Sequence, residues 1–194
     1  MQTLSIGKLR GLQRCAAPGG AFTILALDHR QGLRRALRPA APGSVSDQEL
    51  IDFKLAITRS LAPAATAVLL DPEYSAAQSI AAGCLPPGPG LVVALEATGY
   101  TGDSSARESR LLPGWSAGGA RRMGAEAAKL LVYYHPDSPT AAGVEAFVRA
   151  VAADCAAHQL PLMLEPLSYP LDPASRAVPA ADRCRVIVET ARRL

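Results

Sequence analysis

Polar side chains able to do acid–base or ligand-binding chemistry recur where short apolar runs of the sequence end. The runs begin near positions 22, 66, 91, 128 and 162. The polar residues at or within them that we select as candidates are Asp28, His29, Arg30, Gln31, Asp71, Glu96, Lys129 and Glu165. Because the C-terminal ends of parallel strands meet at one rim of an α/β barrel, these side chains are expected to lie close together.

Glu165 and Lys129 are the two candidates most suited to catalysis. A partly desolvated carboxylate at a strand end, as expected for Glu165, can act as a general acid/base; the alternative is a structural glutamate that caps a helix or pairs with an arginine. Lys129 lies inside an apolar run, and burial of an unpaired ammonium is costly, so it should point into the barrel toward a carboxylate or an anionic ligand. Alternatively, it lies at the start of the strand and extends to solvent.

The first strand end, with Asp28, His29 and Arg30, could bind a hydroxylated, phosphorylated substrate. A carboxylate accepts hydrogen bonds from hydroxyls, and a guanidinium pairs with phosphate. The alternative is a loop with one internal ion pair. A metal site is disfavoured, because His29 and His135 fall at different strand ends and His158 closes a helix. We expect neither a metal nor a cofactor.

Composition excludes several classes of protein. The formal net charge is +3 and the 20 basic residues are scattered, which argues against a nucleic-acid surface. The apolar runs are too short to cross a membrane, and the 4 cysteines form no CxxC pair, which favours a cytoplasmic protein with reduced thiols. Chemistry that needs an amine has only Lys8, Lys54 and Lys129 to choose from, since arginine does not deprotonate. Homo-oligomerisation stays open.

The apolar runs alternate with helical stretches, which indicates a parallel α/β sheet in a single domain, 1–194. No glycine-rich phosphate turn follows the first strand, so a barrel is favoured over a doubly wound sheet. At 194 residues the chain is short of the about 250 that a complete (β/α)8 TIM barrel needs, and it holds about five βα units. The expected helices are 48–61, 74–82, 117–123, 140–158 and 180–194.

Several sequence blocks together resemble the class I tagatose-1,6-bisphosphate aldolase family, and less closely the sulfofructose-phosphate aldolases. They read Leu-Asp-His-Arg at 27–30, Asp-Pro-Glu-Tyr at 71–74, Thr-Gly-Tyr at 98–100, Lys-Leu-Leu-Val-Tyr-Tyr at 129–134 and Glu-Pro-Leu at 165–167. The resemblance implies a (β/α)8 barrel that reversibly cleaves a ketose bisphosphate into dihydroxyacetone phosphate and glyceraldehyde 3-phosphate. The reaction passes through a lysine Schiff base, without metal.

The resemblance also implies residue roles. Glu165 matches the acid/base carboxylate, Asp28 a first-strand carboxylate, and Lys129 a fourth-strand lysine beside the reactive amine. The residues expected to bind the phosphorylated sugar are His29, Arg30, Gln31, Asp71 and Glu96. The family usually reads Asp-Gln-Arg-Gly at the first strand end, whereas His29 stands at the glutamine position here.

A second departure concerns what this sequence lacks. The family's Schiff-base lysine lies on a sixth strand, and its phosphate loops follow strands seven and eight. We therefore expect the N-terminal portion of a longer aldolase, inactive alone and poorly folded because two strand edges stay open. Two alternatives remain: a non-catalytic sugar-phosphate-binding or regulatory remnant, and a metal-dependent aldolase that uses His29 or His135.

Overall fold

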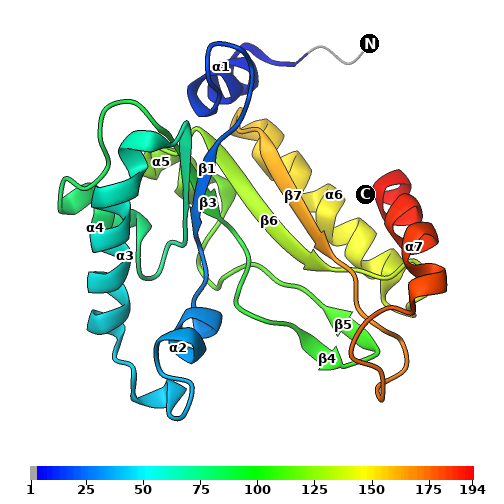
Figure 1. The fold of residues 1–194 in the computed structure, drawn as a ribbon. Coiled ribbons are helices and arrows are strands. Elements are labelled where there is room, and N and C mark those ends of the chain that lie inside the picture. Colours follow the sequence, from blue (N-terminus) through cyan, green and yellow to red (C-terminus); the bar gives the residue numbers. More distant parts are fainter. Residues whose placement is uncertain (1–3) are drawn as a thin grey trace.

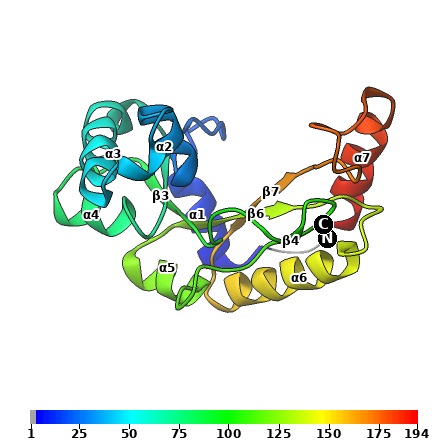
Figure 2. The same ribbon diagram turned by 90° about the horizontal axis from the view of Figure 1, so that it is seen from below.

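Five parallel strands form one curled sheet that carries helices on its outer side (Figures 1 and 2). The computed structural model describes residues 4–194. The strand order is β1-β2-β3-β6-β7, and every neighbouring pair is parallel. The expected half of an α/β barrel is thereby confirmed. The strands are β1 (Ile24–Leu27), β2 (Ala67–Leu70), β3 (Gly90–Ala94), β6 (Ala127–Tyr133) and β7 (Leu162–Leu167).

The helices expected between the strands are present, with ends that differ from the sequence prediction by at most two residues. Local signals explain their boundaries. Ser46 and Glu49 form a reciprocal capping box at the start of α3, and Ser116 caps α5, which ends at Gly124 in the left-handed conformation (φ 100°). The predicted helices are observed as α3 (Asp47–Leu61), α4 (Ala76–Ala81), α5 (Ala117–Met123), α6 (Ala141–Ala157) and α7 (Ala180–Arg193).

Several elements escaped prediction from the sequence. Two of them are α2 (Gln31–Leu37), which contributes to the site, and the antiparallel hairpin of β4 (Thr101–Asp103) and β5 (Ala106–Glu108). A further helix, α1 (Ile6–Cys15), lies across the N-terminal end of the sheet (Figure 1). The remaining elements are the 3-10 helices η1 (Pro42–Ser44) and η2 (Ala62–Ala64).

Close packing explains why α1 contains a glycine, a residue that disfavours helix formation. A Cβ on Gly11 would come within 2.2 Å of the Glu126 carbonyl oxygen, so the helix approaches the loop before β6 closely enough to require glycine. At the C-terminal end of α1, the buried Cys15 packs against the sheet. Tertiary contact, not local propensity, therefore stabilises this helix.

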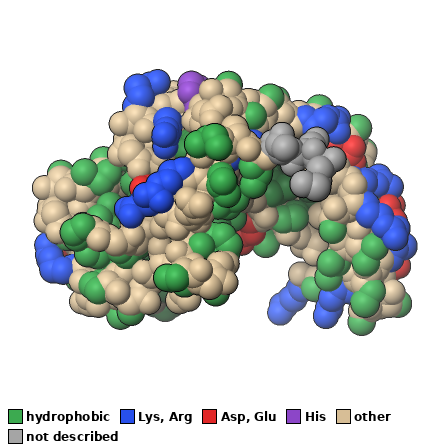
Figure 3. Space-filling view, turned by 90° about the horizontal axis from the view of Figure 1, so that it is seen from above, with side chains coloured by type: hydrophobic (Ala, Val, Ile, Leu, Met, Phe, Trp, Pro, Cys, Tyr) green, Lys and Arg blue, Asp and Glu red, His purple; other side chains and the backbone are tan. Residues whose placement is uncertain are grey.

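The strands divide their side chains between two environments. On β6, Leu130 and Val132 pack into the large core beneath α5 and α6, whereas Lys129, Leu131 and Tyr133 face the concave side. Alternation with a period of two residues makes this division unavoidable. The concave side is open along one flank, and Figure 3 shows the hollow between the part that carries α3 and α4 and the part that carries α7.

A buried ion pair joins α3 to the ends of the first two strands. Lys54 and Asp71 both have fully buried side chains and pair directly, and the Lys54 ammonium also donates to the Leu27 carbonyl at 2.8 Å. Asp71 accepts further hydrogen bonds from Ser75 Oγ (2.7 Å) and the Tyr74 backbone N–H (2.7 Å). Asp71 therefore lies on the helix side of the sheet and does not line the concave side, contrary to its expected role in binding substrate.

None of the helices in residues 4–194 has both the length and the apolar composition that crossing a membrane requires.

Replacing Lys54 with Met should lower the free energy of unfolding by about 3–5 kcal/mol, because the Asp71 carboxylate would then be buried without a counter-charge. The double variant Lys54→Met/Asp71→Leu removes both charges and should recover much of this loss. Urea unfolding followed by circular dichroism measures each difference. A single variant as stable as the wild type would show that the pair contributes nothing to the fold.

Candidate active site

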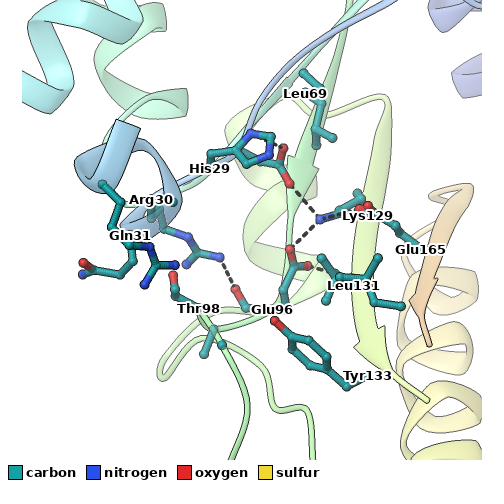
Figure 4. A pocket seen from close by; sticks show the side chains of 17 residues that line it. His29, Arg30, Gln31, Leu69, Glu96, Thr98, Lys129, Leu131, Tyr133 and Glu165 are labelled. Atoms are coloured by element: carbon teal, nitrogen blue, oxygen red, sulfur yellow. Dashed lines mark hydrogen bonds and ion pairs between the residues drawn. The ribbon is translucent and has the colours of Figure 1, made fainter. Parts of the chain in front are cut away.

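A cavity of about 370 Å³ lies at the C-terminal ends of the strands, on the concave side (Figure 4). Its walls come from the end of β1, helix α2, the loop after β3, and strands β6 and β7. The candidate residues that line it are Asp28, His29, Arg30, Gln31, Glu96, Lys129 and Glu165. The sequence therefore predicted most of the polar lining, and only Asp71 lies elsewhere.

Lys129 lies at the centre of the site, within reach of three carboxylates. Its Nζ is 2.7 Å from Asp28 Oδ2, 2.8 Å from Glu96 Oε1 and 3.0 Å from Glu165 Oε2. The lysine side chain is only 2% exposed, so the alternative of a lysine that extends to solvent is wrong. These acidic side chains come from the ends of β1 and β3 and from β7, and they can meet only because the sheet curls.

The charge state of Lys129 follows from this environment. Burial lowers the pKa of the ammonium, but Glu96 and Asp28 beside it raise the pKa by more, and the net result lies well above the ordinary lysine value. Lys129 is therefore a permanent cation at neutral pH. A protonated amine has no lone pair for attack on a carbonyl, so this lysine is suited to electrostatic support and not to nucleophilic attack.

The three carboxylates differ in their exposure and in the number of partners that each has within the protein. Glu96 accepts a second hydrogen bond from the Leu131 backbone N–H at 3.1 Å, and its side chain is 7% exposed. Asp28 is 12% exposed. Glu165 is 49% exposed and pairs only with Lys129 among residues 4–194. Glu165 is accordingly the carboxylate best placed to exchange a proton with a bound ligand.

Arg30 connects three strand ends instead of facing the cavity with an unpaired guanidinium. Its Nη1 lies 2.5 Å from Glu73 Oε2, and its Nη2 donates to the Glu96 carbonyl at 2.7 Å (Figure 4). The guanidinium is almost fully buried. Both terminal nitrogens of Arg30, which were expected to bind a phosphate, are already hydrogen-bonded within the protein. Its neighbours remain available to a ligand: His29 has a side chain 71% exposed, and Gln31 lines the cavity.

The three histidines lie in different parts of the structure. His29 is at the cavity, whereas His135 is buried beside the Tyr169 ring, with centroids 6.3 Å apart. His158 follows α6 and pairs with Asp154 at 3.4 Å. Within residues 4–194, no three His, Cys, Asp or Glu side chains form a group able to hold a metal ion.

One feature of the site, and one cluster that adjoins it through Tyr133, were missed in the sequence. Arg35 lines the cavity from α2, one helical turn after Gln31, and recognising that helix would have revealed the pair by its i,i+4 spacing. On the other side, Arg107 of the hairpin lies over the rings of Tyr100 (4.5 Å) and Tyr169 (4.7 Å), and more distantly over that of Tyr133 (5.5 Å). No local pattern in the sequence indicates this cluster, because its members are up to 69 positions apart.

Similar proteins have this arrangement of strands. A crystal structure from Corynebacterium glutamicum matches with a TM-score of 0.58 and 25% identity, over 82% of this chain and 54% of that one. A Schiff base-forming fructose-1,6-bisphosphate aldolase matches with a TM-score of 0.52 and 19% identity, over 86% and 60% of the two chains. At 19% identity, the match to the fructose-1,6-bisphosphate aldolase shows a shared fold and no more.

Relatives at the sequence level are tagatose 1,6-diphosphate aldolases. That of Lactococcus lactis is 31% identical over 164 residues, which are 84% of this chain and 49% of the relative. That of Streptococcus agalactiae is 32% identical over 164 residues, or 84% and 50%. The chain thus spans about half the length of the curated relatives it matches. The family model described as DeoC/LacD family aldolase matches residues 22–191, and the chain belongs to that family.

Proposed function

We propose that the intact protein reversibly cleaves a ketose bisphosphate such as tagatose 1,6-bisphosphate into dihydroxyacetone phosphate and glyceraldehyde 3-phosphate through a lysine Schiff base. The observation that carries the proposal is the Lys129 ammonium held by Asp28, Glu96 and Glu165 at the C-terminal rim. Active sites of α/β barrels occupy this rim. The curated relatives named as tagatose 1,6-diphosphate aldolases support the choice of substrate.

Carbon–carbon cleavage next to a ketone needs an electron sink, which an iminium formed from a neutral lysine amine provides. None of the described lysines suits this task. Lys8 belongs to α1 at the opposite end of the sheet, and Lys129 is held as an ammonium. Burial lowers the pKa of Lys54, but its Nζ is hydrogen-bonded to Asp71 and lies outside the cavity. We therefore assign the Schiff base to a lysine outside these 194 residues.

Glu165 is the general acid/base in this proposal. As the carbon–carbon bond breaks, its carboxylate takes the proton of the hydroxyl on the departing carbon. The O–H electron pair forms the aldehyde carbonyl, and the pair from the broken bond moves to the iminium, which becomes an enamine. Glu165 then returns the proton to the enamine carbon. The half-exposed position of Glu165 beside Lys129 suits both transfers.

Lys129 supports the same reaction without forming a bond. Its positive charge orients the carboxylates around it. A fixed ammonium beside a second lysine also lowers the pKa of that second amine, which increases the fraction able to attack the ketone. Asp28 and Glu96 hold Lys129 in position, at 2.7 and 2.8 Å.

Replacing Glu165 with Gln should lower the turnover number by about 10²-fold or more, as expected when a general acid/base is lost. Stability and substrate affinity should change little, because the side chain is half-exposed and makes one contact. A coupled cleavage assay of the intact protein, together with urea unfolding, measures both. Glu108→Gln, an exposed change on β5, is the matched control and should behave as wild type. A turnover unchanged in Glu165→Gln would exclude the proposed role.

Borohydride reduction in the presence of dihydroxyacetone phosphate should attach one adduct to the intact protein, on a lysine other than Lys8, Lys54 and Lys129. Reduction traps an iminium as a stable secondary amine, so peptide mass spectrometry locates the residue. A stoichiometric adduct on Lys129 would contradict its assignment as a supporting cation. Loss of cleavage with a chelator, and no adduct, would instead indicate a metal-dependent aldolase.

A further inference from the structure

We infer that Arg35, with Gln31 one helical turn before it, forms a binding site for a phosphate monoester of the substrate at the edge of the cavity. The inference rests on the proposed function, which supplies a phosphorylated sugar. Both side chains belong to α2 and line the cavity. The Arg35 side chain is exposed and makes no hydrogen bond or ion pair within residues 4–194.

The distribution of charge in the cavity singles out Arg35. The lining carries three carboxylates around one ammonium, which leaves its interior with an excess of negative charge. The Arg30 cation is already balanced by Glu73. Arg35 is thus the lining cation whose charge is unbalanced within the described chain. A phosphate dianion is repelled by the acidic interior and attracted to this edge, so a phosphorylated sugar would be oriented on entry.

The preceding residue fixes the helix that carries Arg35. Arg34 is buried, donates to the Val45 carbonyl, pairs with Asp47 and lies 5.5 Å from the centroid of the Tyr74 ring. Successive residues of a helix point about 100° apart, so Arg34 anchors α2 to the protein while Arg35 faces the cavity. A site on an anchored helix loses less conformational entropy when it binds a ligand.

The donors along this edge match a phosphate. A guanidinium presents a planar fork of N–H groups that pairs with two phosphate oxygens at once. Gln31, at the i−4 position relative to Arg35, adds a side-chain amide on the same helix face. Thr98 and Gly99 line the same cavity from the loop after β3, and Thr98 can contribute a hydroxyl donor. The carboxylates of the cavity, by contrast, repel a phosphate and are suited to accept hydrogen bonds from sugar hydroxyls.

Titration of the intact protein with sn-glycerol 3-phosphate, followed by calorimetry, tests the site without any need for catalysis. Arg35→Met should weaken binding by about 10- to 10²-fold, the effect of losing charge-assisted hydrogen bonds. Arg35→Lys, which keeps the charge and loses the fork, should be intermediate. The matched control is Arg183→Met, which removes the same charge from an exposed position on α7 and should bind as wild type.

Equal affinity of wild type and Arg35→Met would overturn the inference, as would a wild type that does not bind the probe. Equal weakening by Arg35→Met and Arg183→Met would overturn it as well, since it would reflect net charge alone. Urea unfolding of Arg35→Met should match wild type, because the exposed Arg35 side chain makes no hydrogen bond or ion pair within residues 4–194. If the wild type binds the probe but cleaves no ketose bisphosphate, the proposed function fails while the phosphate site stands. If it does cleave, Arg35→Met should raise KM and leave kcat nearly unchanged.

Discussion

The charge on Lys129 constrains the architecture around it. A buried ammonium is tolerated only with counter-charges and hydrogen bonds, and it obtains them from Asp28, Glu96 and Glu165. These residues lie in three different segments, and β1 and β7 are the outer strands of the sheet. A flat sheet would hold them too far apart to meet one Nζ atom. The curl of the sheet and the ionisation of the site therefore depend on each other.

Two charge centres lie at the same end of the sheet, one on each face. On the helix side, Lys54 and Asp71 are fully buried and tie α3 to β1 and β2. On the concave side, Lys129 and its partners border a cavity. The first centre has no access to a ligand and serves the fold, whereas the second keeps one exposed carboxylate. Lys54 and Lys129 thus differ mainly in whether a ligand can approach the ion pair that each forms.

The sequence predicted the five strands, five of the helices and the convergence of most polar strand ends, because these features follow from local periodicity. It did not reveal that Asp71 turns away from the cavity, since a residue just past a strand can face either side of the sheet. The sequence also did not reveal that the Arg30 guanidinium is hydrogen-bonded to Glu73 and Glu96, because these contacts span 43 and 66 positions. Pairing of this kind is decided by tertiary structure, which a single chain's local pattern does not encode.

The alternation along β6 also has a consequence for folding fidelity. Lys129 faces the carboxylates, and the next residue, Leu130, is fully buried in the aliphatic core. A slip of β6 by one residue would exchange the two, placing an ammonium among aliphatic side chains and a leucine among three carboxylates. Misaligned pairings of β6 with β3 and β7 are therefore strongly disfavoured. The charged residues of the site thus help to fix the register of β6 between β3 and β7.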